Sequence, residues 1–245
     1  MALIARCTDA ILAVVLAPLC AACRNPLDAP LQGAVCGDCW SRIRILTEPL
    51  CIVCGDTLTS WRSTGASDGR CLRCRRAPRV ITRGRAIGAY EETLRDVLRA
   101  LKYDGRRSVA RRLGQLMAQT GATILEGADF AVPVPLHVLR HYRRGFIQAA
   151  QLAAHIGIPQ LRALRRRRAT LTQTDLPESE RHRNVRGAFA VRRSARASLE
   201  GAVVVVIDDV STTGATLDAC AAVLLAAGAR EVRALTAARA VSRLP

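Results

Sequence analysis

Apolar residues in the second half of the chain fall into blocks that predict alternating strands and helices. Residues 201–207 form a continuous apolar run (GAVVVVI), as in a strand that is buried on both faces of a parallel sheet. Residues 215–227 predict a helix that Gly228 ends, and residues 231–238 predict another strand. A strand, a helix and a strand in this order predict a βαβ unit, so the fold class expected here is α/β.

The same alternation continues upstream with weaker signals. Residues 83–90 predict a strand, and residues 91–101 predict a helix with one apolar face. The apolar positions of that helix are Leu94, Val97, Leu98 and Leu101. Further elements are expected at residues 108–120 (helix), 129–134 (strand), 144–156 (helix) and 160–164 (strand). Residues 165–198 are polar and rich in arginine, with only weak periodicity.

The N-terminal segment, residues 1–19, predicts a short amphipathic helix that packs on the body of the protein. Its apolar stretch at residues 10–19 is too short to span a bilayer. No small-residue cleavage site follows it cleanly, which argues against a signal peptide. The sequence therefore predicts no transmembrane segment, and a role at a membrane surface is the alternative.

The composition points to an anionic partner. The chain of 245 residues carries 37 Lys and Arg against 20 Asp and Glu, a formal charge of +17, and Lys102 is its only lysine. The guanidinium group of arginine binds phosphate and carboxylate groups well, although a genome-wide bias toward Arg codons would give the same excess of arginine. Aromatic residues are only 3% of the chain, which leaves the core to Ala, Val, Leu and Ile and argues against extensive base stacking.

Eight of the ten cysteines form four Cys-x-x-Cys pairs before residue 75. They are Cys20/Cys23, Cys36/Cys39, Cys51/Cys54 and Cys71/Cys74. This spacing predicts closed, structural Cys₄ zinc sites, with consecutive or cross-braced pairing both open and a redox Cys-x-x-Cys as the main rival. The other two, Cys7 and Cys220, are expected to be small buried residues. Zinc thiolates need a reducing compartment, so we expect a cytoplasmic protein.

These patterns divide the chain into two expected domains. Residues 1–78 would form the N-terminal helix and a metal-stapled module, because a metal replaces a hydrophobic core in such sequences. Residues 79–245 would form the α/β domain.

Residues 203–216 (VVVVIDDVSTTGAT) carry the clearest chemistry. Asp208 and Asp209 follow the strand, where two carboxylates can accept hydrogen bonds from vicinal hydroxyls and help to hold a divalent cation. The loop after them leads into a helix, whose N–H groups and dipole favour an anion, and Gly214 lets the backbone approach it closely. Each piece alone could be a solvated turn or a helix cap, but the ordered string predicts a phosphate site.

This string resembles the 5-phosphoribosyl-1-pyrophosphate (PRPP) motif of type I phosphoribosyltransferases. The resemblance implies that Asp208 and Asp209 are the catalytic carboxylates and bind the ribose hydroxyls, and that Mg²⁺ bridges these hydroxyls and the pyrophosphate. It also implies a cradle for the 5-phosphate, formed by Ser211, Thr212, Thr213, Gly214, Ala215 and Thr216.

Further segments resemble the ComF family, and together they cover almost the whole chain. Its "VPVP…R…RGFNQ" signature matches residues 131–135 with Arg140, Arg143, Arg144-Gly145-Phe146 and Gln148. Its later motifs match Arg168, Thr170, Gln173, Glu180-Arg181, Asn184-Val185 and Gly187-Ala188-Phe189, and its "lKy.g" element matches Leu101-Lys102-Tyr103 with Gly105. The cysteine pairs match its double zinc ribbon. Ile147 departs from the family, which usually has Asn there.

The resemblance implies a fold and a function. The fold would be a type I phosphoribosyltransferase fold, a Rossmann-like parallel sheet flanked by helices, preceded by a small double zinc-ribbon domain. Pyrophosphate would bind at residues 133–140, with Lys102, Arg140 and Arg144 as candidate ligands, unless these arginines only begin a solvated helix.

The expected function is Mg²⁺-dependent PRPP binding, with transfer of the phosphoribosyl group to an unknown acceptor if the domain is catalytic. The family is linked to DNA uptake in natural transformation. Two alternatives follow: a non-catalytic competence factor that binds single-stranded DNA and DNA-uptake proteins, with Arg165–168 against the strand backbone, or a regulator that senses PRPP.

Overall fold

The computed structural model describes residues 8–9, 12, 14, 16–58, 68–103, 107–136, 148–168 and 178–241. The helices are η1 (Pro30–Gln32), α2 (Gly37–Ser41), α3 (Leu72–Arg76), α4 (Glu92–Tyr103), α5 (Arg107–Thr120), α6 (Ala122–Leu125), α8 (Gln148–Ala153), α9 (Glu178–Val185), η3 (Arg193–Ala195), α10 (Arg196–Leu199) and α11 (Ala215–Leu225). The strands are β1 (Gly84–Ala89), β2 (Phe130–Pro133), β3 (Leu164–Arg166), β4 (Phe189–Val191), β5 (Val203–Ser211) and β6 (Glu231–Arg239).

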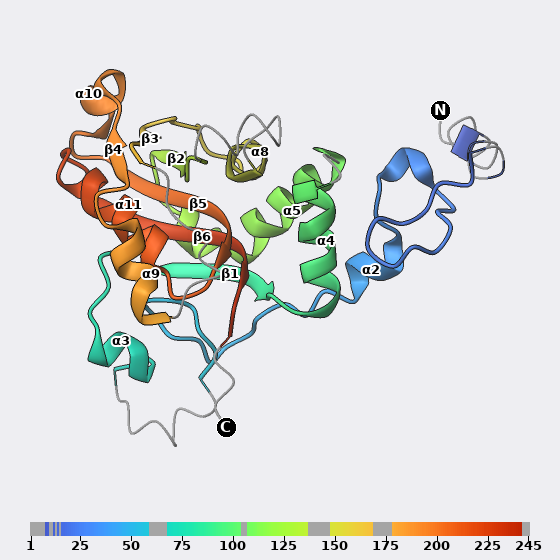
Figure 1. The fold of residues 1–245 in the computed structure, drawn as a ribbon, viewed down its shortest axis with the longest axis horizontal. Coiled ribbons are helices and arrows are strands. Elements are labelled where there is room, and N and C mark those ends of the chain that lie inside the picture. The colour runs from blue at the N-terminus through green and yellow to red at the C-terminus, as the bar shows by residue number, and fades with distance from the viewer. Residues whose placement is uncertain are drawn as a thin grey trace.

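A four-stranded parallel sheet, in the order β1-β6-β5-β2, forms the centre of the molecule (Figure 1). It confirms the strands predicted at residues 83–90, 129–134 and 231–238, and the βαβ unit is β5-α11-β6. β5 runs past the predicted end at residue 207, because its ladder with β6 continues until Ser211 pairs with Arg239. All four carboxyl ends therefore meet at one edge of the sheet.

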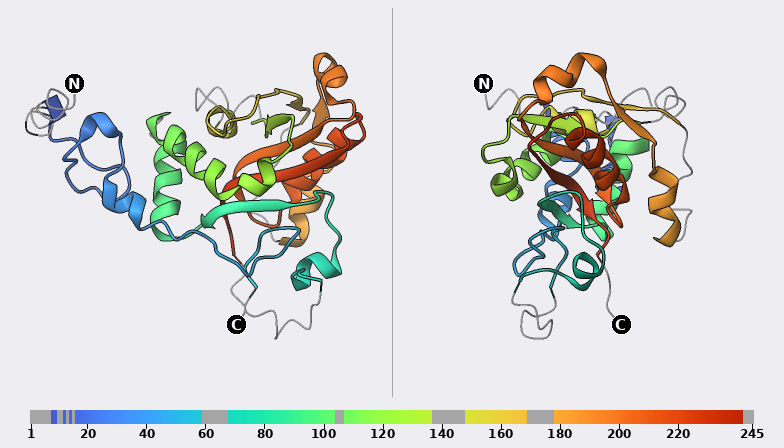
Figure 2. Two further views of the ribbon diagram at one scale, coloured as in Figure 1. Left: turned by 180° about the vertical axis from the view of Figure 1, so that it is seen from behind. Right: turned by 90° about the vertical axis from the view of Figure 1, so that its left-hand side faces the viewer.

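Helices cover both faces of this sheet, as Figures 1 and 2 show. Val205 and Ile207 of β5 pack on the side of α4, α5 and α8. Val204 and Val206 pack on the opposite side with α11 and the β3-β4 pair. All four are fully buried, which is why the strand reads as an unbroken apolar run.

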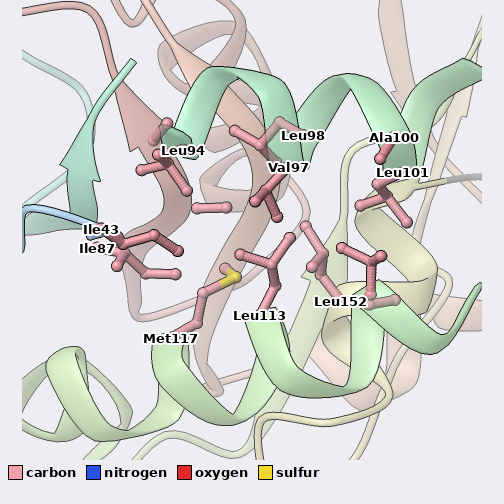
Figure 3. Packing of buried hydrophobic residues seen from close by; sticks show 14 of the residues in the cluster. Ile43, Ile87, Leu94, Val97, Leu98, Ala100, Leu101, Leu113, Met117 and Leu152 are labelled. Carbon is pink, nitrogen blue, oxygen red and sulfur yellow. The ribbon is translucent and has the colours of Figure 1, made fainter. Parts of the chain in front are cut away.

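The helix predicted at residues 91–101 packs as its pattern indicates (Figure 3). Its four predicted apolar positions are at most 2% exposed, and they face Leu113 and Met117 of α5. An amphipathic helix pair thus covers the sheet, and the helix predicted at residues 108–120 is confirmed as α5.

Both cysteine modules pack against the sheet domain. The first ribbon, residues 16–43, lies beside α4 and α5, and Trp40 stacks with Arg112 of α5 at 4.8 Å from guanidinium carbon to ring centroid. The chain then runs along β1, where Leu46 N–H donates to Ile87 O at 2.8 Å. The second ribbon, residues 47–58 and 68–76, lies below β1 in Figure 1.

The middle of the chain differs from its prediction. The strand expected at residues 160–164 is a single parallel bridge from Gln160 to Ala131, and β3 begins only at Leu164. The stretch with weak periodicity forms β3, α9 and β4 around residues that are not described. β3 and β4 have three residues each, so cross-strand pairing defines them rather than any repeat in the sequence.

The N-terminal segment is helical at its described positions, 8–9, 12, 14 and 16. Its Asp9 is buried and accepts a 2.8 Å hydrogen bond from Leu31 N–H of the first ribbon. Val14 and Leu16 are 83% and 66% exposed, so the expected packing on the body is wrong for these two side chains. None of the helices in the described part of the chain has the length and hydrophobicity that crossing a bilayer requires.

Candidate functional site

Asp208 and Asp209 lie near the C-terminal end of β5, at the carboxyl edge of the sheet. Both are half-buried. Asp208 Oδ1 accepts from Asp209 N–H at 2.9 Å, and Asp209 Oδ1 accepts from Val210 N–H at 2.8 Å. The backbone therefore fixes the orientation of both carboxylates before any ligand arrives.

The loop that follows turns directly into α11. Gly214 is the N-cap and has a φ of 80°, in the left-handed region that glycine adopts without strain. Because a glycine holds this position, no N-cap side chain closes the first helical turn. The buried Thr213 hydroxyl accepts from Ala215 N–H at 3.3 Å. Ser211 Oγ is buried and finds no hydrogen-bond partner in the described residues, which leaves a donor for an anion.

Arg79 supports this loop through its side chain, and no local pattern in the sequence indicated this role. Its Nε donates to Asp218 Oδ2 at 2.6 Å, and its Nη1 donates to Thr213 O at 2.9 Å. The guanidinium also fills the space against Gly214, where a Cβ would overlap it. Only a pairing between residues 139 positions apart reveals the role of this arginine.

Cys220 of α11 is fully buried, as predicted, whereas Cys7 lies outside the described residues. Burial raises the pKa of the Cys220 thiol well above its usual range, and the negative charge of Asp208 raises it further. The positive charge of Arg166 lowers it. Asp208 and Arg166 therefore act on the pKa of the same buried thiol in opposite directions.

A pocket of about 250 Å³ lies at the carboxyl end of β2, the strand that pairs with β5. Pro133 lines it, and this residue pairs with Ile207, which immediately precedes Asp208. The described residues that line the pocket include no acidic side chain and four arginines, at positions 162, 165, 166 and 192. The excess of positive charge makes the pocket suitable for an anion.

The predicted pyrophosphate ligands cannot be placed. Arg140, Arg144 and the side chain of Lys102 lie outside the described residues, so their role stays a prediction. Two other motif residues do meet: Arg168 Nη2 donates to Asn184 O at 3.3 Å, and so ties β3 to α9.

The eight paired cysteines form two groups of four sulfur atoms, each within 4.8 Å of one another. The first group is Cys20, Cys23, Cys36 and Cys39, and the second is Cys51, Cys54, Cys71 and Cys74. The grouping is consecutive, which settles the pairing that the spacing left open.

The dimensions of both groups fit zinc. Two sulfur pairs in the first group are 3.8 Å apart, and one pair in the second is 3.6 Å apart. Tetrahedral zinc with bonds of about 2.3 Å places its sulfurs about 3.8 Å apart. In each group the third cysteine, Cys36 or Cys71, donates its N–H to the sulfur of the first at 3.3 Å. Both groups are thus built as closed structural zinc sites.

Comparison with known proteins agrees with this architecture. A double zinc ribbon domain model matches residues 11–75, and a phosphoribosyl transferase domain model matches residues 135–244. The chain is 32% identical over 225 residues to the DNA utilization protein YhgH of Escherichia coli K12, covering 88% of this chain and 94% of the relative. The chain belongs to the ComF family.

Other relatives of this ComF-family chain carry competence names. Competence protein F of Haemophilus influenzae is 29% identical over 90% of this chain and 96% of its own length. Competence protein ComFC of Bacillus subtilis is 27% identical over 79% of each chain. A solved glutamine PRPP amidotransferase from B. subtilis is 28% identical over 52% of this chain and 26% of its own, with a TM-score of 0.35.

Proposed function

We propose that this ComF-family protein binds PRPP together with Mg²⁺ at the carboxyl edge of β5. The observation that carries the proposal is the direct succession of two backbone-oriented carboxylates and a glycine-capped helix start. Asp208 and Asp209 would accept hydrogen bonds from the ribose hydroxyls. The 5-phosphate would lie against the loop from Ser211 to Thr216, where the helix dipole and the Ser211 hydroxyl favour an anion.

Pyrophosphate departure from the anomeric carbon, followed by attack of an acceptor, is the chemistry that such a site would support. The chain would contribute positioning and electrostatic relief of the leaving charge. The arginine-lined pocket at the end of β2, whose Pro133 pairs with the residue before Asp208, would supply positive charge to an anionic leaving group or acceptor. When bound, Mg²⁺ would neutralise ligand oxygens, with Asp208 and Asp209 as the protein groups that hold it.

Calorimetric titration of PRPP with Mg²⁺ into the zinc-loaded protein tests this proposal. We expect binding by the wild type and at least about tenfold weaker binding by the Asp208→Asn/Asp209→Asn variant, because amides cannot replace paired carboxylates toward a cation and two hydroxyls. Pyrophosphate release on addition of candidate acceptors would then test for transfer.

The matched control is Asp28→Asn/Asp38→Asn, which makes the same change in charge at exposed positions of the first ribbon. It should bind PRPP like the wild type. If both double variants lose PRPP affinity equally, the loss comes from the change in net charge and not from the site. If a folded, zinc-loaded wild type does not bind PRPP, the proposal is refuted.

Binding of single-stranded DNA is a second candidate function, favoured by the exposed arginines of the β3-β4 region. Arg165, Arg167 and Arg168 are exposed, and Arg162 and Arg192 lie beside them. The names of the relatives, which concern DNA utilization and competence, agree with such a partner. This function predicts affinity that falls steeply with salt and is weakened by Arg165→Ala but unchanged by Asp208→Asn/Asp209→Asn. Salt-independent binding would argue against it.

A further inference from the structure

The second zinc ribbon is connected to the candidate phosphate loop through two arginines, Arg79 and Arg239, that the proposed chemistry does not use. It lies directly against the edge strand β1, and a Cβ on Gly55 would lie only 2.6 Å from Gly84 O. Arg85 Nη1 of β1 donates to Cys51 O of the ribbon at 3.2 Å. This close fit leaves the ribbon little freedom to move relative to the sheet.

Arg79 makes the first connection to the loop. It lies five positions after Cys74, the last cysteine of the second group, and its side chain is only 4% exposed. Its guanidinium joins Thr213 O to the Asp218 carboxylate, while Asp218 Oδ1 also accepts from Val80 and Ile81 N–H at 3.1 and 3.3 Å. The chain leaving the ribbon therefore makes three hydrogen bonds to Asp218 in the first turn of α11 and one to Thr213 in the loop before it.

Arg239 makes the second connection. It is the last residue of β6 and the register partner of Ser211, where the loop begins. Its side chain, 3% exposed, donates from Nη2 to Cys54 Sγ at 3.4 Å, and its Nε lies 3.4 Å from Asp56 Oδ1. One guanidinium thus links a sulfur of the second group to the strand pair that ends in the loop.

The first ribbon occupies a different part of the molecule. Its buried residues belong to the core formed with α4 and α5, and its Trp40 stacks on Arg112. Figures 1 and 2 place it at the far side of α4 from β5 and α11. Of the two groups of cysteines, the second is therefore connected to the candidate site by the contacts described above, whereas the first packs elsewhere.

We infer that the second zinc ribbon is the scaffold of the phosphate-binding loop, with Arg79 and Arg239 as its positioning residues. Metal occupancy at Cys51, Cys54, Cys71 and Cys74 sets the conformation of residues 211–216, and the first site has no such control. The consequence for PRPP affinity rests on the proposed function. The consequence for the loop itself does not, because loop order can be measured without a ligand.

A matched pair of cysteine variants tests the inference. Cys39 and Cys74 are the fourth cysteines of their groups, both lie in five-residue helices, and both are 3% exposed. Each variant, Cys39→Ser and Cys74→Ser, is followed by zinc analysis, by hydrogen exchange of residues 208–218 without ligand, and by calorimetry with PRPP and Mg²⁺. We expect Cys74→Ser to speed loop exchange and to weaken binding, each by about tenfold or more, and Cys39→Ser to change either by less than about twofold.

Arginine variants keep both zinc sites intact and cover the case in which Cys74→Ser does not fold. Arg79→Ala should act on the loop like Cys74→Ser, and Arg79→Lys should restore part of the effect, since it keeps one donor and the charge. The control is Arg83→Ala, at an exposed position four residues further on.

Equal effects of Cys39→Ser and Cys74→Ser on the loop, or an unchanged loop in Arg79→Ala, would overturn the inference. The two proposals can fail separately. If the wild type does not bind PRPP, but loop exchange becomes faster in Cys74→Ser and Arg79→Ala and not in the controls, the proposed function is refuted and the scaffold role is supported.

Discussion

At the scale of single residues, the backbone conformation and the surrounding space determine how much a substitution costs, even where the residue type is the same. Among the glycines in the described part of the chain, Gly214 combines a positive φ with close contact to a buried guanidinium. Gly201 has a similar φ of 69° but nothing within 4 Å of the position of its missing Cβ. Gly201 is therefore needed only for its positive φ, whereas Gly214 is needed both for its positive φ and because a Cβ would overlap Arg79.

Gly214→Ala and Gly201→Ala should therefore differ in their cost. The left-handed conformation alone costs about 1–2 kcal/mol, which is the expected loss for Gly201→Ala. Gly214→Ala should cost about 2–4 kcal/mol, because the added methyl must also displace Arg79. Urea unfolding measures both, and equal losses would mean that Arg79 moves aside without penalty.

At the scale of elements, helices with a clear apolar face formed where the pattern placed them. The facing pair α4 and α5 buries an unbroken layer of leucine, valine and methionine against the sheet (Figure 3). The three-residue strands β3 and β4 had no such signal, since a run of Leu-Arg-Arg shows no periodicity. Their pairing with each other defines them, and it places Arg165 and Arg166 of β3 in the lining of the arginine-rich pocket.

Leu113→Ala tests how much the helix pair contributes to stability. Leu113 is fully buried between α4 and α5, so its truncation leaves a cavity and should cost about 2–5 kcal/mol in the free energy of unfolding. The control is Leu225→Ala on α11, where the side chain is 36% exposed and the loss should be about 1 kcal/mol. Denaturant titration of both variants gives the comparison, and similar losses would contradict the packing seen here.

At the scale of the whole molecule, two small metal modules are built onto one parallel sheet. Each ribbon is organised around four cysteines, and the first also adds buried apolar residues to the core with α4 and α5, while the sheet is buried on both faces by helices. The two parts should therefore depend differently on metal, because zinc replaces a core in the ribbons only.

Metal analysis of the purified protein should find two zinc ions per chain. Their removal by a chelator should abolish hydrogen-exchange protection in residues 16–58 and 68–76, while residues 203–207 of β5 and 231–235 of β6 keep theirs. Fewer than two zinc ions per chain, or disulfides in place of thiolates, would contradict the zinc assignment. Loss of hydrogen-exchange protection throughout the chain would show that the sheet does not remain folded without the ribbons.

The local features of this protein could be predicted from its amino-acid sequence. Hydrophobic periodicity located β1, α4, α5, β5, α11 and β6, because burial on one or both faces repeats over several neighbouring residues. The order of strand, carboxylates, loop and helix located the candidate site, and cysteine spacing identified the zinc modules. The boundary at residue 78, the cytoplasmic location and the ligands Lys102, Arg140 and Arg144 stay predictions.

The contacts that join these parts became known from the three-dimensional fold. The consecutive grouping of the cysteines, the β3-β4 pair, the arginine-lined pocket and the support of the loop by Arg79 and Arg239 all depend on contacts between distant segments. Arg79 and Asp218 are 139 positions apart, and Arg239 and Cys54 are 185 apart. A local pattern carries no information about such pairs, because the folding of the whole sheet brings them together.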